Sequence, residues 1–160
     1  MWLANNESTY ATVGIGSSDD SYYVGQAEFD PGEDISICKV VLDPNAAVGD
    51  TSGRTFYVQV WTMSGTSLDV LQGESDGVAG SAAWDFSPVD FEFSTPVDLS
   101  NGTDYCIVVT MKAVSGLAYA TIQFTDAKTG FDGYAAYWNS SKEKKSPGGG
   151  IDFKCEIYTD

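Results

Sequence analysis

Three side chains on one short segment have the residue types and the spacing to hold a sugar. Tyr57, Gln59 and Trp61 alternate with apolar residues in the segment 55–61, so they share one face of a predicted strand. Two aromatic rings could stack on sugar rings while the amide of Gln59 bonds a hydroxyl group. The alternative is that a connecting loop or a second protein covers these rings.

The segment 141–146 carries the one basic cluster of an acidic chain. Lys142, Lys144 and Lys145 surround Glu143 there. Because opposite charges steer association, this loop could dock on an acidic neighbour, including a second copy of the same chain. The alternative is a loop tip that only contacts solvent.

Carboxylates gather in three predicted turns. These are Asp19 with Asp20, Asp30 with Glu33 and Asp34, and Glu74 with Asp76. Hard cations such as Ca²⁺ favour oxygen donors that lie close together. None of the three groups has the spacing of an EF-hand loop, so we predict no metal site and no cofactor, with surface solvation as the role of these residues. A structural Ca²⁺ is the alternative at each turn.

The residue types argue against an enzyme. The chain has no histidine, which removes the usual pairing of a nucleophile with an imidazole base. It also lacks a G-x-S-x-G elbow, a P-loop and a cysteine pair with zinc spacing. A glycosidase needs only two carboxylates at the right separation, but no such pair stands out. We therefore predict no catalytic residues.

Charge and hydropathy exclude two classes of partner. The 23 acidic residues against 8 basic ones give a formal net charge of −15, which would repel a polyphosphate. No segment approaches the roughly 18–20 continuous apolar residues of a membrane span. The start of the chain lacks the basic region and apolar core of a secretory signal. We expect no nucleic-acid partner, no membrane insertion and no visible signal peptide.

The three cysteines, Cys38, Cys106 and Cys155, form an odd set. Cys38 and Cys155 each alternate with large apolar residues, so both are predicted to point into the core, where a free thiol behaves as a small apolar group. We expect reduced thiols. If the strands of Cys38 and Cys155 are neighbours, a disulfide between them is the alternative.

These residues lie on a chain whose pattern predicts strands throughout. Short segments with a two-residue period, each ended by a turn signal, indicate strands at 22–29, 35–42, 55–61, 68–73, 84–93, 104–111, 117–124, 134–138 and 151–158, with loops at 45–54 and 139–150. The sequence therefore predicts an all-β fold, an antiparallel two-sheet sandwich of jelly-roll type with eight or nine strands. Residues 1–20 are expected to form a polar arm or an edge strand, and residues 21–160 a single domain.

From about Tyr22 onward, the order of motifs resembles a jelly-roll domain of phage structural proteins and of bacterial surface or secreted proteins. The matching residues are Gly25, Gln26 and Phe29; Ile35, Ser36, Val40 and Leu42; Val58, Val60 and Trp61; the pattern F-x-F-x-x-P-V-x-L-x-x-G-T-x-Y-x-I-V from Phe91 to Val108; Gly133, Tyr134, Ala136 and Tyr137; and Asp152, Phe153, Ile157 and Tyr158. Each is a core or turn requirement, so the resemblance concerns the fold more than a site.

The resemblance implies a non-enzymatic structural or decoration protein, an accessory component of a virion surface such as a capsid decoration or tail protein. Its localisation would be the virion surface or the extracellular space. Its partner would be a protein in a larger assembly, held through the arm or the basic loop, with self-association as one form of this contact. Similarity in shape to carbohydrate-binding modules implies the second possibility, an adhesin-like module that binds a glycan through Tyr57, Gln59 and Trp61.

Overall fold

Strands are the only regular secondary structure in the part of the chain that the structure describes. The computed structural model describes residues 3–4, 9–15, 22–112, 119–125, 133–147 and 152–160. Within these ranges, no helix has the length and hydropathy that crossing a membrane would require. The all-β fold predicted from the two-residue periodicity is confirmed.

The described strands are more numerous than the eight or nine expected. In chain order, they are β1 (Leu3–Ala4), β2 (Thr9–Gly14), β3 (Tyr23–Phe29), β4 (Ile35–Leu42), β5 (Asn45–Val48), β6 (Thr55–Ser64), β7 (Ser67–Glu74), β8 (Val78–Ala79), β9 (Val89–Leu99), β10 (Tyr105–Lys112), β11 (Tyr119–Thr125), β12 (Tyr134–Trp138), β13 (Lys144–Pro147), β14 (Asp152–Phe153) and β15 (Glu156–Thr159). The additional strands are short segments at sheet edges and at a point where the chain changes sheets.

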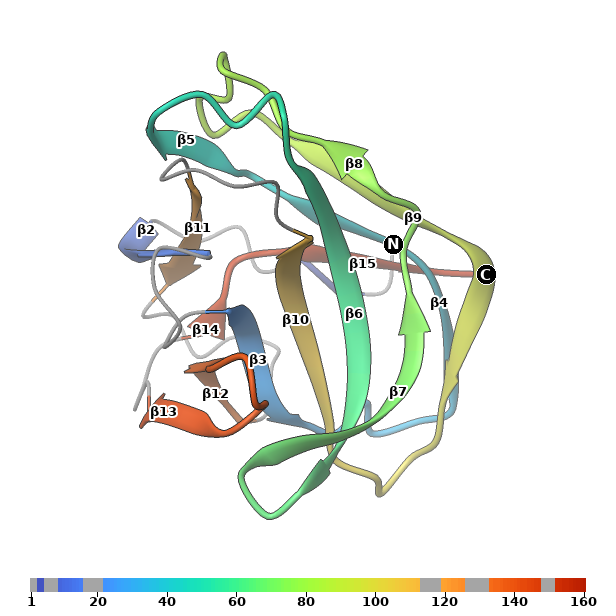
Figure 1. Ribbon diagram of the computed structural model, residues 1–160. Helices are drawn as coiled ribbons and strands as arrows, with labels where there is room; N and C mark the ends of the chain where they lie inside the picture. Colours follow the sequence, from blue (N-terminus) through green and yellow to red (C-terminus); the bar gives the residue numbers. More distant parts are fainter. Residues whose placement is uncertain (1–2, 5–8, 16–21, 113–118, 126–132, 148–151) are drawn as a thin grey trace.

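Hydrogen bonds connect the described strands into three antiparallel sheets. The seven-stranded sheet has the order β13-β12-β3-β10-β6-β7, with β8 also paired to β6. A second sheet has the order β1-β15-β4-β9, and a third joins β14, β11 and β2, with β5 also paired to β11. In Figure 1, β15 and β4 run behind β6, so the second sheet lies across the core from the first. The jelly-roll connectivity stays a prediction.

One apolar core fills the space between the sheets. Phe56, Val58 and Val60 of β6 point into it and are at most 1% exposed, as their alternation predicted. The same cluster takes Phe91 from β9 and Phe124 from β11. Burying a large apolar side chain stabilises the fold by about 1.5–3 kcal/mol, so the burial of this shared cluster is the main contribution to holding the three sheets together.

A bulge in β4 reverses the expected direction of Cys38. Ile37 and Val40 are both fully buried although they are three residues apart. The pairing of β4 shifts at this point against both of its neighbours, β15 and β9. An extra residue in a strand changes which side chains face the core. The prediction that Cys38 points into the core is therefore wrong, whereas Cys155, which is 2% exposed, lies in the core as predicted.

Several strand boundaries differ from the predicted ones, and the segment 144–147, which was expected to be loop, forms β13 and pairs with β12. The segment 45–48 was expected to be a loop but forms β5, which pairs with β11. The predicted strand 84–93 begins only at Val89, because Pro88 cannot donate a ladder hydrogen bond. Asp85 also turns the chain there, by accepting a bond from the Ser87 amide at 3.2 Å.

The last predicted strand, 151–158, is divided between two sheets. Phe153 of β14 pairs with Phe124 in the third sheet, and Ile157 of β15 pairs with Val40 in the second. The alternation of Phe153, Cys155 and Ile157 toward the core is confirmed, since all three are buried. The described parts of the N-terminal segment, β1 and β2, lie at sheet edges.

Candidate functional site

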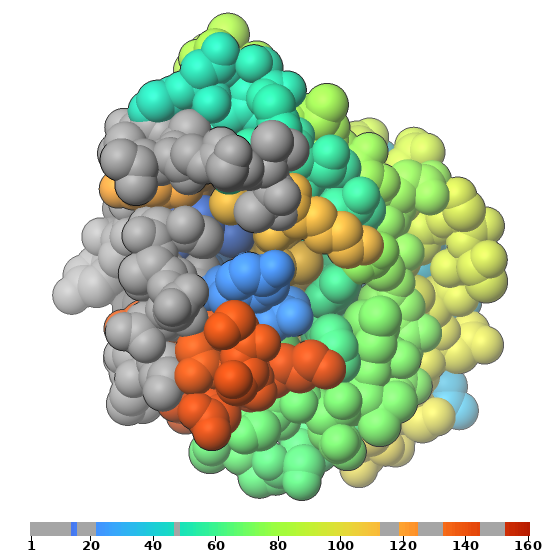
Figure 2. Space-filling model, in the orientation of Figure 1, coloured from blue at the N-terminus to red at the C-terminus, as the bar shows by residue number. Residues whose placement is uncertain are grey.

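One face of the seven-stranded sheet brings both predicted sites together. We call it the outer face: the side turned away from the shared core, which carries Tyr57, Gln59 and Trp61 on β6 and Tyr134 on β12. The loop 139–143 folds back over this face. In Figure 2 the atoms of residues 133–144, in orange-red, adjoin those of β3 in blue and β7 in green on one continuous surface.

The outer face has a small apolar cluster of its own. Its buried members are Tyr23, Ala27, Trp61, Leu68, Cys106, Val108, Ala136 and Trp138. Trp138 is fully buried, and its Nε1 donates to the carbonyl oxygen of Thr66 at 2.9 Å. Ala27 of β3 and Ala136 of β12 are the small side chains of this cluster, and the turn between β6 and β7 contacts Trp138 through Thr66.

Trp61 is part of this cluster and is not an open platform. Its side chain is 6% exposed. The Tyr23 ring meets it edge-on with centroids 6.1 Å apart, and its Nε1 donates to Oε1 of Gln59 at 2.9 Å. The sequence left open whether the Trp61 ring is an exposed sugar platform or is covered, and these contacts correspond to a covered ring.

Gln59 and Tyr57 belong to a polar chain along the edge of the outer face. The amide of Gln59, which is 6% exposed, donates to Glu74 of β7. Lys112 of β10 bonds the other oxygen of Glu74 at 2.6 Å, and its Nζ lies 4.0 Å from the centre of the Tyr57 ring. The hydrogen bond to Glu74 raises the pKa of Lys112. The amide of Gln59 and the indole N–H of Trp61 are therefore already hydrogen-bonded within the protein.

A tight turn places Lys142 over Trp61. Within this turn, Oδ1 of Asn139 accepts the amide of Glu143 at 2.9 Å, and the Lys142 amide donates to the carbonyl oxygen of Asn139 at 2.9 Å. Lys142 has a φ of 65°, a left-handed conformation that is uncommon outside glycine. Its Nζ lies 4.2 Å from the centre of the Trp61 ring, and its carbonyl oxygen accepts the Leu68 amide at 3.2 Å.

Lys144 makes the same kind of contact with Tyr134. Its Nζ lies 3.9 Å from the ring centre and 2.6 Å from the phenol oxygen. That hydroxyl donates to Oε1 of Glu28 at 3.0 Å. Burial, and then the bond to Glu28, raise the pKa of Tyr134, so the phenol stays neutral at physiological pH. Lys145 lies in β13, and its side chain is outside the described residues.

The outer face thus has balanced charge on a strongly acidic protein. The ammonium groups of Lys112, Lys142 and Lys144 each lie on an aromatic ring. They are accompanied by Glu28, Glu74 and Glu143, of which Glu74 forms an ion pair with Lys112. Chemically, such a face can bind by packing and hydrogen bonding without charge repulsion against another acidic protein.

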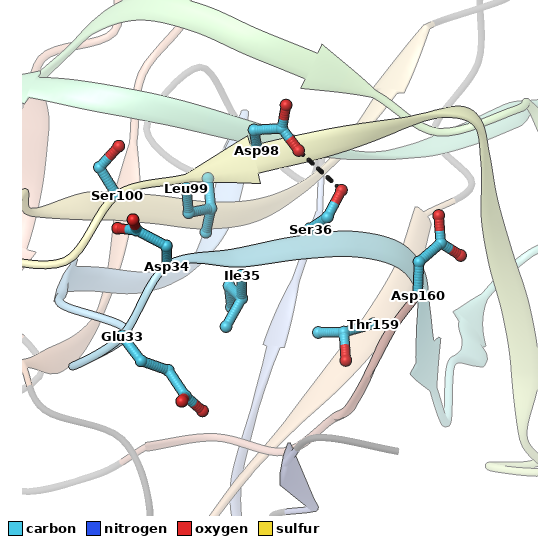
Figure 3. A pocket seen from close by; sticks show the side chains of 9 residues that line it. All are labelled: Glu33, Asp34, Ile35, Ser36, Asp98, Leu99, Ser100, Thr159 and Asp160. Atoms are coloured by element: carbon cyan, nitrogen blue, oxygen red, sulfur yellow. Dashed lines mark hydrogen bonds between the residues drawn. The ribbon is translucent and has the colours of Figure 1, made fainter.

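A hollow in the described surface lies elsewhere, between the end of β9 and the start of β4. Its volume is about 600 Å³, and Glu33, Asp34, Asp98 and Asp160 contribute carboxylates to its lining. Figure 3 shows Asp34 just before β4 and Asp98 on the adjacent strand β9, with the Ser36 hydroxyl donating to Asp98 at 2.7 Å. The hollow is wide and open.

The predicted carboxylate turns have structural partners. Oδ1 of Asp30 accepts the amides of Gly32 and Gly102, at 2.9 and 3.1 Å, and Oδ1 of Asp34 accepts the amide of Asn101 at 2.9 Å. Asp76 accepts the hydroxyl of Ser94 and Glu74 bonds Lys112, while Asp19 and Asp20 lie outside the described residues. Among the described side chains, no three carboxylates or thiols come close enough to hold a metal ion.

All three cysteines are free. Cys38 lies on β4, which pairs with β15. Cys155, however, comes just before the start of β15, whereas Cys38 bonds the carbonyl oxygen of Tyr158 near the end of that strand. Burial raises the pKa of Cys106 to about 12 and also raises that of Cys155. Such thiols are poor nucleophiles near neutral pH.

The sequence identified Trp61 and Lys142 as members of two separate candidate sites but did not predict that their side chains are in contact. The sequence does contain one signal of the outer face, because Tyr134 and Trp138 lie on the same side of a five-residue strand. The contact of Lys112 with Tyr57 depends on the pairing of β10 with β6, which has no local sequence signal. No protein-family model and no curated protein matches this chain.

Proposed function

We propose that this protein is a non-enzymatic structural component of a larger protein assembly and that it docks through the outer face. The proposal rests on the observation that the aromatic row of β6 and the basic loop lie on one face, with Lys142 of the loop over Trp61 of β6. The hydrogen-bonded turn and the buried Trp138 hold this face in one conformation. A rigid face loses little conformational entropy when a partner covers it.

The composition of the outer face supports a protein partner. Half-buried tyrosines lie next to lysines whose charge is matched by glutamates, whereas much of the remaining surface is acidic. Aromatic residues are enriched in protein interfaces, and uncompensated charge is depleted there. The motif order that resembles phage structural proteins supports a virion surface, as a capsid decoration or tail component, as the assembly.

The test replaces the wild-type chain in its assembly with the double variant Lys142→Ala/Lys144→Ala. We expect at least a tenfold lower ratio of this chain to the main structural protein in purified particles, measured by quantitative mass spectrometry. Lys39→Ala is the matched control, because Lys39 also lies over a ring, that of Tyr158, but on the second sheet. An equal ratio for the double variant and the control would refute docking through the outer face.

A glycan array separates this proposal from the carbohydrate-binding alternative. Decoration predicts no reproducible glycan signal for the wild-type chain. Binding that is lost in Tyr57→Ala, the half-exposed ring of the row, would instead identify an adhesin-like module. Tyr57 is the better probe than Trp61, because replacing a buried tryptophan also changes stability.

A further inference from the structure

The turn between β9 and β10 carries an asparagine followed by a glycine, Asn101-Gly102, and both residues are exposed. Gly102 has a φ of 76°, and a Cβ at this position would meet no atom within 4 Å. Because glycine has no side chain, nothing attached to Gly102 shields its backbone nitrogen. Asparagine is also one of the chemically labile residues of proteins. The turn is therefore a candidate for a change in covalent structure.

The reaction open to this pair needs only water as a co-reactant. The Gly102 nitrogen loses its proton and attacks Cγ of Asn101, the bond from Cγ to Nδ2 breaks, and ammonia leaves. The side chain and the main chain then form a cyclic imide. Water opens this ring to give aspartate, or isoaspartate, in which the main chain runs through the side-chain carbon. Overall, one water is consumed, one ammonia is released and nothing is oxidised or reduced.

Two carboxylates hold the peptide units on either side of Asn101. Oδ1 of Asp34 accepts the Asn101 amide at 2.9 Å, and Oδ1 of Asp30 accepts the Gly102 amide at 3.1 Å. The second of these bonds involves the attacking nitrogen itself. The nitrogen of the cyclic imide carries no hydrogen, so the ring cannot close without the loss of this bond. A negative charge on the nitrogen is also opposed by the neighbouring carboxylate. Both effects slow the reaction.

The side chain of Asn101 has no such restraint, because none of the described residues bonds its amide group. Asn139 provides the contrast. Its Oδ1 accepts the Glu143 amide at 2.9 Å, and its Nδ2 donates to Oε2 of Glu143 at 3.1 Å. It is followed by Ser140, whose side chain hinders attack by the backbone nitrogen. The structure thus separates a reactive asparagine from a protected one.

We propose that Asn101 is a site of spontaneous covalent modification, converted to aspartate and isoaspartate at a rate that Asp30 and Asp34 keep low. The new carboxylate forms close to Asp34, which bonds the amide of the same residue, and like charges repel. Isoaspartate also adds a carbon to the main chain between the two bonded amides. The conversion therefore weakens the connection between the turn after β3 and the turn after β9, and it does not reverse.

The experiment incubates the full chain in warm, mildly alkaline buffer and follows its tryptic peptides by mass spectrometry over several weeks. Asn101 is the single asparagine of the peptide 55–112, and Asn139 is that of the peptide 129–142. Hydrolysis replaces an NH2 group by OH, and an isoaspartate methyltransferase labels the isoaspartate. We expect the folded wild type to convert at Asn101 at least about tenfold more slowly than the same chain in urea, where the bond to Asp30 is absent. Equal rates in the two states overturn the proposal.

Asp30→Ala is expected to raise the rate at Asn101 by about tenfold in the folded chain, and leave Asn139 unchanged. Asp98→Ala is the matched control, because Asp98 lines the same hollow but bonds the Ser36 hydroxyl. Conversion at the wild-type rate in both variants, or faster conversion of Asn139 in Asp30→Ala, refutes the protection by Asp30. The added variant Asn101→Ser in the Asp30→Ala chain must abolish the mass change of the peptide 55–112.

The effect of the product is tested with Asn101→Asp, which places the new carboxylate in the turn without incubation. We expect a lower melting temperature than for Asn101→Ser, which keeps the backbone amide and adds no charge. Equal melting temperatures would contradict the repulsion by Asp34. None of these tests involves the outer face, so their failure leaves the docking proposal intact, and the reverse holds as well.

Discussion

The ammonium of Lys142 lies 4.2 Å from the centre of the Trp61 ring. The two residues are far apart in the sequence, and each was a candidate for a different kind of binding. In the structure they form one contact that covers the ring and holds the loop. A cation over a tryptophan face stabilises by about 0.5–1 kcal/mol at exposed sites and more where water is excluded.

Replacing Lys142 with alanine is expected to lower the free energy of unfolding by about 0.5–1 kcal/mol and to expose Trp61. Tryptophan emission shifts to longer wavelength, and acrylamide quenches it more strongly. Lys39→Ala, which removes the cation over Tyr158, leaves the emission unchanged. In a Trp61→Phe background, Lys142→Ala should no longer affect the emission, and a shift that persists would place its origin at another tryptophan.

Trp61→Ala is expected to lower the free energy of unfolding by about 3–5 kcal/mol, because it empties a buried site and removes the hydrogen bond to Gln59. An exposed sugar platform would predict a change within about 0.5 kcal/mol. Urea denaturation followed by circular dichroism measures the difference. Tyr57→Ala, at the half-exposed end of the row, serves as the comparison and loses less stability.

Most of the strands were predictable because the forces that form them are local. Phe56, Val58 and Val60 alternate with polar or aromatic residues, and this pattern by itself fixes which face of β6 meets the core. β12 was predicted with its observed bounds for the same reason. The bulge at Cys38 was not predictable, since it depends on how β4 pairs with β15 and β9 at the same time.

The candidate site was predictable only in pieces. Residue types identified Trp61 and Lys142, but their contact depends on the turn that Asn139 closes and on the pairing of β12 with β3 and of β3 with β10. Lys112 and Glu74 reach Tyr57 and Gln59 from neighbouring strands. Contacts across a sheet follow from strand register, which a single sequence specifies less clearly than strand position.

Gly25→Ala is expected to destabilise the fold by about 1–3 kcal/mol or more. Gly25 lies on β3 at the centre of the seven-stranded sheet, where a Cβ would lie 2.0 Å from the carbonyl oxygen of Ile107 in β10. Gly53→Ala is the control, since a Cβ there meets no atom within 4 Å. Thermal unfolding of the two variants gives the comparison, and similar melting temperatures would mean that the two strands are not so close in solution.

The thiols are expected to react in a fixed order. Iodoacetamide at pH 8 labels the half-buried Cys38 in the native protein, whereas Cys106 and Cys155 react only after unfolding. Mass spectrometry of tryptic peptides measures the labelling of each cysteine. Rapid labelling of Cys155 in the native state would indicate that the junction between β14 and β15 opens.

The Cys106 thiol also predicts a loss of stability in alkali. Burial raises its pKa from 9.0 to about 12, so the folded state holds this proton more tightly than the unfolded state does. The contribution is fully present below pH 9 and decreases as the pH rises toward 12, because only the unfolded chain releases the proton in this interval. In Cys106→Ala, urea midpoints measured across this interval should decrease less steeply than in the wild type, and identical slopes would contradict the prediction.

The carboxylates of Asp30 and Asp34 fasten the turn between β3 and β4 to the turn between β9 and β10, through the amides of Gly102 and Asn101. This pairing limits where a foreign peptide can be grafted for display. Lengthening either turn pulls both pairs apart, so neither tolerates an epitope or an affinity tag. The exposed Ser52–Gly53 corner, where a side chain at Gly53 would meet no neighbour, offers an insertion point that leaves the two fastened turns untouched.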